Sequence, residues 1–201
     1  MTYKLKRSLD IAGSIAIVLV TCPVQLAVAS ALYIQGKLNS AYSGPILYRA
    51  ERVDENLNTF TMFKFRSMIN SNTLDTTLTE EGLTLIPEDR ITPIGRIIRR
   101  YSLDELPQVL NILKGEMSIV GPRPRSIEEA IYLSTLGYTN VLSQRPGLTS
   151  RACIDCLDQG KERRDLTLQE MGQLDSQHNY TLYDDLSIIF RTALRGWRHG
   201  R

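Results

Sequence analysis

The densest chemistry in this 201-residue chain lies in one short stretch, residues 99–108. Here Asp104 and Glu105 stand side by side, after two arginines and before an apolar run. Adjacent carboxylates beside fixed cations suit a divalent metal ion and a phosphorylated substrate. The stretch therefore predicts a phosphate-handling centre, with Asp104 and Glu105 as candidate catalytic residues and metal ligands.

The same residues also allow a purely structural interpretation. Ser102 and Glu105 fit an S-x-x-E capping box, and acids in a first helical turn complement the helix dipole. Pro107 argues against this, because it falls just past the positions where a missing N–H costs nothing. A helix that begins near Leu106 would instead leave Asp104 and Glu105 on its lead-in, available for chemistry. Both interpretations stay open on the sequence alone.

Further basic elements could bring phosphate groups to this centre. Lys64 and Arg66 share one face of a predicted strand, which suits phosphate as well as a solvated strand face. Arg123 stands between two prolines, which fix the backbone and present its guanidinium at low entropic cost. Arg145 opens another basic turn, followed by proline and glycine.

The surrounding pattern predicts the elements that position these residues. Alternating polarity indicates two strands, residues 46–50 and 59–66, joined as a hairpin. Thr92 and Pro93 fit the N-cap and N1 positions of a helix with an apolar stripe. The basic face of that helix delivers Arg99 beside Asp104.

Past the dyad, the pattern continues with helices and one strand. A helix stops at Gly115 and leads to a short buried strand, residues 117–120. Ser126 caps the next helix. Residues 151–173 are charged and show no recognisable motif, and residues 174–195 are predicted to be helical. The predicted fold class is α+β, mostly helical.

The N-terminal apolar run, residues 11–34, has three interpretations: a cleaved signal peptide, a spanning helix, or a helix that enters the membrane and returns. Pro23 splits the run into halves of about a dozen residues, each near 18 Å long at ~1.5 Å per residue, too short to cross alone. Basic residues flank both ends, so both ends prefer the cytoplasm. We therefore favour the re-entrant helix.

The overall composition gives no support for a nucleic-acid-binding, disulfide-rich or zinc-binding protein. The net charge is +2, which gives no reason to expect nucleic-acid binding. Three cysteines do not form a disulfide framework, and Cys153 and Cys156 make a lone C-x-x-C with too few partners for a zinc site. Trp197, among arginines near the C-terminus, suits a membrane headgroup interface, and equally an untethered tail.

Five segments together resemble the bacterial sugar transferases, of the small monotopic phosphoglycosyl transferase type. They are KRSLDIAGS (6–14), GPILYRAER (44–52), MFKFRSM (62–68), ITPIGRIIRRYSLDELPQVLNILKGEMSIVGPRP (91–124) and RPGLTS (145–150). The resemblance covers most of the chain up to residue 150, and the long block is highly specific. Two places depart from the family: the hairpin turn lacks its usual glycines, and the segment after RPG has a different sequence.

The resemblance implies an architecture and a location. Residues 1–38 would form a re-entrant membrane helix broken at Pro23, where Cys22 replaces the usual serine. Residues 39–201 would form a cytoplasmic catalytic domain with interfacial amphipathic helices, one of them C-terminal. The protein would be monotopic, on the cytoplasmic face of the bacterial inner membrane and in contact with its lipid. A homodimer is compatible with this interpretation.

The resemblance also implies a reaction. A phosphosugar would pass from a UDP-sugar to polyprenyl (undecaprenyl) phosphate with Mg²⁺, giving a polyprenyl-diphosphate sugar and UMP, the first membrane step of bacterial glycoconjugate assembly. Asp104 would be the nucleophile and Glu105 would position metal and reactants, with phosphate or uridine contacts from the following residues: Lys64, Arg99, Arg123 and Arg145. Direct transfer in one step, or an inactive lipid-phosphate-binding protein, are the alternatives.

Overall fold

The structure is a computed structural model that describes residues 3–69, 77–78, 84–85, 88–158, 166–177 and 181–195. In chain order, with η for a 3₁₀ helix, its elements are α1 (Tyr3–Leu38), η1 (Ser40–Tyr42), β1 (Leu47–Val53), β2 (Thr59–Phe65), β3 (Thr77–Leu78), β4 (Thr84–Leu85), η2 (Glu88–Arg90), α2 (Pro93–Arg100), η3 (Leu103–Gln108), α3 (Val109–Lys114), β5 (Ser118–Val120), α4 (Ile127–Thr135), α5 (Thr139–Leu142), β6 (Gly147–Thr149), α6 (Arg151–Asp158), α7 (Leu168–Ser176) and α8 (Leu182–Arg195). Helices dominate and the described sheets are two-stranded, which confirms the predicted mostly helical α+β class.

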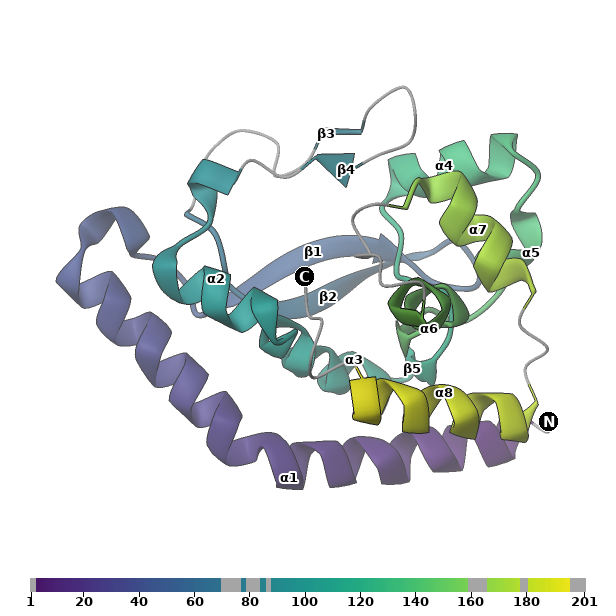
Figure 1. The fold of residues 1–201 in the computed structure, drawn as a ribbon, viewed down its shortest axis with the longest axis horizontal. Coiled ribbons are helices and arrows are strands. Elements are labelled where there is room, and N and C mark those ends of the chain that lie inside the picture. The colour runs from purple at the N-terminus through teal and green to yellow at the C-terminus, as the bar shows by residue number, and fades with distance from the viewer. Residues whose placement is uncertain are drawn as a thin grey trace.

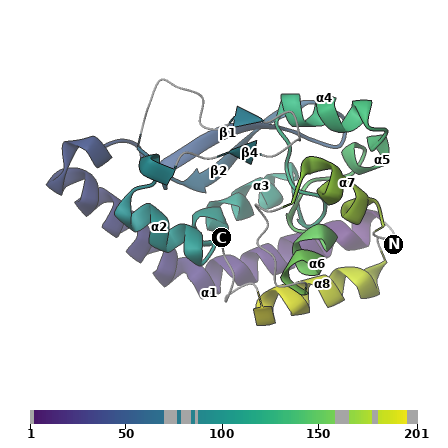
Figure 2. The same ribbon diagram turned by 45° about the horizontal axis from the view of Figure 1, so that its top comes forward.

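The long helix α1 runs along one edge of the molecule, with α8 beside its N-terminal part (Figures 1 and 2). Pro23 lies inside α1, and the helix is assigned without interruption through it, although its axis changes direction along its length in Figure 1. By length and composition α1 could cross a membrane, and only 11% of its most apolar 18-residue window is buried. A soluble core helix would be mostly buried, so α1 is a candidate membrane anchor. The division at residue 38 stays a prediction.

The first turns of α1 are fixed to the globular part by polar side chains. Arg7 donates to two backbone carbonyls at the C-terminal end of α3, at 2.5 and 2.7 Å. Asp10 is buried and accepts from the Ser118 hydroxyl (3.0 Å) and from the next backbone N–H of β5 (2.9 Å). Lys6 pairs with Asp185 of α8 at 2.6 Å. The KRSLDIAGS segment therefore attaches the membrane-candidate helix to the domain.

The strands β1 and β2 form the predicted antiparallel hairpin, which confirms that part of the sequence analysis. Its register pairs Tyr48 with Lys64 and Arg52 with Phe60, so these side chains share one face of the sheet. The outer edge of β2 is covered by the side chain of Asn111, which accepts from one backbone N–H and donates to one backbone carbonyl of that strand. Asn111 thus satisfies groups that an exposed edge would leave unpaired.

Apolar side chains form three buried clusters that hold these layers together. The first joins the hairpin to α3, β5, α6 and α8, and the second joins α4, α6 and α7. The third packs the C-terminal half of α1 against β2 and α2. Both ends of α1 therefore contact the domain that carries the site.

The C-terminal third contains a helix where the sequence showed no motif, and the helix predicted over 174–195 has different bounds. Residues 151–158 form helix α6, and Thr167 caps α7 through the same S/T-x-x-E box that identified the helix at Ser126. The single helix expected over 174–195 is the end of α7 followed by α8, and residues 178–180 lie outside the described part. A capping signal was present at Thr167, but the charged composition around it concealed it.

Candidate active site

The acidic pair lies on a 3₁₀ turn that precedes helix α3. Asp104 and Glu105 belong to η3, and the α-helix begins only at Val109. Ser102 adopts a left-handed conformation (φ 52°, ψ 23°) and makes no side-chain capping bond. The capping-box interpretation is therefore wrong, and the two carboxylates sit on a lead-in, as the alternative predicted.

The charge environment of Asp104 is set by burial and by three neighbours. Together these raise its pKa to about 6: burial is the largest cause and the charge of Glu105 also raises the pKa, while Lys64 and Arg99 lower it. The Lys64 ammonium lies 3.1 Å from a Glu105 carboxylate oxygen. At pH 7 Asp104 is therefore mostly ionised, the state that a nucleophile or a metal ligand requires.

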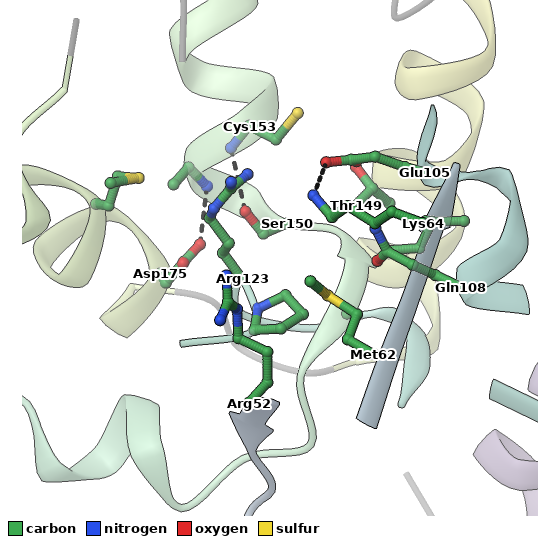
Figure 3. A pocket seen from close by; sticks show the side chains of 15 residues that line it. Arg52, Met62, Lys64, Glu105, Gln108, Arg123, Thr149, Ser150, Cys153 and Asp175 are labelled. Atoms are coloured by element: carbon green, nitrogen blue, oxygen red, sulfur yellow. Dashed lines mark hydrogen bonds and ion pairs between the residues drawn. The ribbon is translucent and has the colours of Figure 1, made fainter. Parts of the chain in front are cut away.

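An open pocket lies beside this pair (Figure 3). Three cations line it: Arg52 from β1, Lys64 from β2 and Arg123 from the loop after β5. The remaining lining side chains are mostly uncharged, and one of them, Asp175 of α7, is a buried acid. The pocket therefore combines cations for phosphate groups with hydrogen-bonding groups for a neutral polar ligand.

The structure brings some of the predicted site residues to this pocket and places others elsewhere. Lys64, Glu105 and Arg123 line it. Asp104 and Arg99 lie next to them, close enough for mutual electrostatic influence. The pocket is thus contiguous with the acidic pair, and the roles of these five residues stay predictions.

Two predicted phosphate ligands lie outside the pocket lining. Arg66 is buried, and its Nε and Nη1 atoms have no hydrogen-bond partner among the described residues. It is therefore not on a solvated strand face, and its burial lowers its pKa. Arg145 forms an ion pair with Glu55 of the hairpin turn, at 2.5 and 3.0 Å. Trp197 lies outside the described residues.

Sequence reasoning missed two charged residues of the pocket, Arg52 and Asp175. Arg52 could have been found from strand alternation, because it shares the sheet face of Lys64. Asp175 had no local signal. Burial raises the pKa of the Asp175 carboxyl. The charge of Arg125 and hydrogen bonds from Ala152, Ser150 and the Arg123 backbone lower the pKa, but by less than burial raises it. Asp175 therefore connects α7, the start of α6 and the loop that carries Arg123.

The acidic pair fits a magnesium ion by the chemistry of its donors. Mg²⁺ is commonly held by one or two carboxylates together with substrate phosphates. Here the pKa of Asp104 is raised mainly by burial and in smaller part by the charge of Glu105, and a cation bound by the pair would offset both effects. Among the described residues no group of three or more His, Cys, Asp or Glu could hold a metal, so substrate phosphate oxygens and water would supply the other ligands.

Comparisons with known proteins identify the family of the chain. The chain matches the family model described as "Bacterial sugar transferase" over residues 1–199. It is 36% identical to the undecaprenyl-phosphate galactose phosphotransferase of Salmonella typhimurium, covering 94% of this chain and 40% of that protein. It is 35% identical to the UDP-glucose:undecaprenyl-phosphate glucose-1-phosphate transferase of Caulobacter vibrioides, covering 94% of this chain and 68% of that one.

A third relative is nearer to this chain in length. The exopolysaccharide production protein ExoY of Rhizobium meliloti is 34% identical, and the match covers 93% of this chain and 83% of that protein. By contrast, the chain spans about two fifths of the length of the Salmonella protein. The matched region contains the acidic pair and the pocket in each case, because it covers nearly the whole chain.

Proposed function

Since the chain belongs to the bacterial sugar transferase family, we propose that it transfers a phosphosugar from a UDP-sugar to polyprenyl (undecaprenyl) phosphate. The products would be a polyprenyl-diphosphate sugar and UMP. The relatives named above as undecaprenyl-phosphate sugar-phosphate transferases support this substrate class. The step would begin the membrane phase of glycoconjugate assembly.

One observation carries the proposal: an ionisable Asp104, under the influence of two cations, lies beside a cation-lined pocket. Lys64 and Arg99 act on its charge, and Arg123 lines the adjoining pocket. A carboxylate is a weak nucleophile, so positioning and neutralisation of the diphosphate must supply most of the rate. The site provides both.

In the first step the Asp104 carboxylate attacks the β-phosphorus of the UDP-sugar. The bond from that phosphorus to the bridging oxygen breaks, and UMP leaves with the electron pair. Lys64 and Arg99 stabilise the charge that develops on the phosphoryl oxygens. A phosphosugar–aspartyl intermediate remains, with its sugar still attached to the phosphate.

In the second step an oxygen of the polyprenyl phosphate attacks the same phosphorus. The aspartyl–phosphorus bond breaks, which regenerates the Asp104 carboxylate and releases the polyprenyl-diphosphate sugar. When bound at Asp104 and Glu105, Mg²⁺ would neutralise diphosphate charge. A Glu105 carboxylate that holds the metal would bind Lys64 less strongly, and the Lys64 ammonium would then be available to a phosphate group.

We place the protein on the cytoplasmic face of the bacterial inner membrane, with α1 entering the lipid, turning near Pro23 and returning to the same side. The apolar side chains exposed on α1 support membrane contact, and the basic residues at both ends support a cytoplasmic position for each end. Helix α8 would lie in the interface beside α1. This arrangement holds the site at the depth of the lipid phosphate.

The test is incubation of detergent-solubilised protein with Mg²⁺ and a panel of UDP-sugars without acceptor, read by intact mass. We expect a gain of one phosphosugar, absent in Asp104→Asn. Turnover with polyprenyl phosphate but no adduct with any donor would favour direct transfer instead. Full turnover by Asp104→Asn would exclude covalent catalysis by that residue, and no adduct and no turnover would overturn the proposal.

A further inference from the structure

The pocket contains a pair of like charges that the mechanism above does not use. We propose that Arg52 is a substrate-binding residue that forms, together with Arg123, a two-guanidinium clamp for the phosphate that leaves with the nucleotide. This inference rests on the proposed function and extends it to a residue that the sequence motifs did not single out.

The backbone places the two arginines next to each other. Arg52 is near the end of β1 and Arg123 is in the loop after β5, 71 positions later in the chain. The backbone N–H of Val53 donates to the carbonyl of Arg125 at 3.0 Å, which joins the end of the strand to that loop. Both side chains line the same pocket and lie close together in Figure 3.

The two guanidinium groups repel each other. Burial is the main cause that lowers the pKa of Arg52, and the charge of Arg123 lowers it further. Glu129 attracts Arg52, but it is also engaged in the capping box of α4, where it accepts from the Ser126 N–H. Within the described residues the Arg123 side chain makes no hydrogen bond or ion pair. An anion between the two guanidiniums would relieve the repulsion.

The position of the pair within the pocket indicates which phosphate it binds. Arg52 pairs with Phe60 on β2, and Lys64 is four residues further along that strand. The Cα atoms of Arg52 and Lys64 are therefore about 13 Å apart along the strand direction, at ~3.3 Å per residue. Lys64 belongs to the reacting end, where it contacts Glu105 beside Asp104. A nucleotide-linked diphosphate has one phosphate at the reacting carboxylate and a second next to it. The second phosphate, which departs as part of UMP, is the one that faces Arg52 and Arg123.

The experiment measures binding of UMP, UDP and uridine to the full detergent-purified chain by calorimetry. Arg52→Gln should weaken UMP and UDP binding tenfold or more and leave uridine unchanged, because uridine carries no phosphate. Arg52→Lys should weaken UMP and UDP binding less, because lysine keeps the positive charge and loses only the planar, two-pronged geometry of the guanidinium. Arg49→Gln is the matched control: it removes the same charge from the exposed, opposite face of β1 and should bind as wild type.

Unchanged UMP binding in Arg52→Gln would overturn the clamp. So would absence of UMP binding in the wild type. A lower melting temperature of Arg52→Gln than of Arg49→Gln would mean that the substitution also destabilises the fold. UMP binding is then compared between wild type and Arg52→Lys, and unchanged binding in Arg52→Lys would count against the clamp. Normal turnover with unchanged KM in Arg52→Gln would remove the clamp and leave the proposed function intact. No turnover by the wild type with any UDP-sugar would remove the proposed function itself.

Discussion

Lys64 donates to Glu105 at 3.1 Å and at the same time lowers the pKa of the neighbouring Asp104. One strand lysine therefore serves two adjacent carboxylates that lie 40 residues further along the chain. The fold achieves this by packing β2 directly on the 3₁₀ turn of the acidic pair. The charge state of the candidate nucleophile is consequently controlled from the hairpin.

Replacing Lys64 should change the pH dependence of the reaction. Lys64→Gln removes a cation that lowers the pKa of Asp104, so that pKa should rise above about 6. Because the reaction requires the carboxylate, the acid limb of kcat/KM should move to higher pH, and the rate at pH 7 should fall by tenfold or more. The measurement is kcat/KM between pH 5 and 8.5 at fixed Mg²⁺.

A control for this shift is Lys114, at the end of α3. It lies over the ring of Phe63 at 4.6 Å and is not among the groups that shift the pKa of Asp104. Lys114→Gln should leave the acid limb in place. An unshifted limb in Lys64→Gln would mean that Lys64 does not set the charge of Asp104.

Asp104→Asn should stabilise the metal-free protein at high pH. Folding raises the pKa of Asp104 from 3.8 to about 6, so ionisation is disfavoured in the folded state. The penalty is absent below pH 3.8, grows between the two values, and is complete above 6, where it reaches about 3 kcal/mol at ~1.36 kcal/mol per pKa unit. Denaturant unfolding with EDTA should show this gain at pH 8 and little gain at pH 4. An equal or lower stability at pH 8 would contradict the burial of a charged Asp104.

Local signals were sufficient to predict much of the framework. Strand alternation gave the hairpin, and the caps at Thr92 and Ser126 form as their motifs predict. The stop at Gly115 is a left-handed C-cap with φ of 92°. Each of these depends on residues within a few positions of one another, so the sequence contains the whole cause.

The remaining features depend on distant contacts, which no local pattern encodes. Ser102 matches a capping box but adopts a left-handed backbone, and the box does not form. Arg145 pairs with Glu55, 90 positions away, instead of lining the pocket. Asp175 reaches the pocket only because α7 packs against α4 and α6. In all three cases tertiary packing decides the outcome.

The attachment of α1 should depend on one buried carboxylate. Asp10→Ala leaves the Ser118 hydroxyl and a β5 backbone N–H without their acceptor, which should cost roughly 1–3 kcal/mol of unfolding free energy. Ser8→Ala is the control, because Ser8 is exposed and bonds only within its own helix. Unfolding of both variants in the same detergent gives the comparison. Equal stability of the two variants would show that Asp10 does not hold α1 to β5.

Membrane contact of α8 can be tested with the single tryptophan of the chain, Trp197, two positions after the helix. Phe190 is 64% exposed on α8, and Ile131 is 60% exposed on α4, at the opposite side of the molecule in Figure 1. Phe190→Glu removes an apolar contact of about 1.5–3 kcal/mol and adds a charge, so α8 should leave the interface. Ile131→Glu adds the same charge away from it.

The readout is quenching of Trp197 fluorescence by brominated lipids in vesicles that contain the full chain. Wild type and Ile131→Glu should be quenched equally, and Phe190→Glu should lose more than half of the quenching. Quenching is compared at equal amounts of vesicle-bound protein, so that the difference reports the position of α8 and not the amount of bound protein. Strong quenching of Phe190→Glu would show that this apolar face does not dock α8 on the membrane. Absence of quenching in the wild type would place Trp197 away from the lipid, against the prediction from its arginine-rich surroundings.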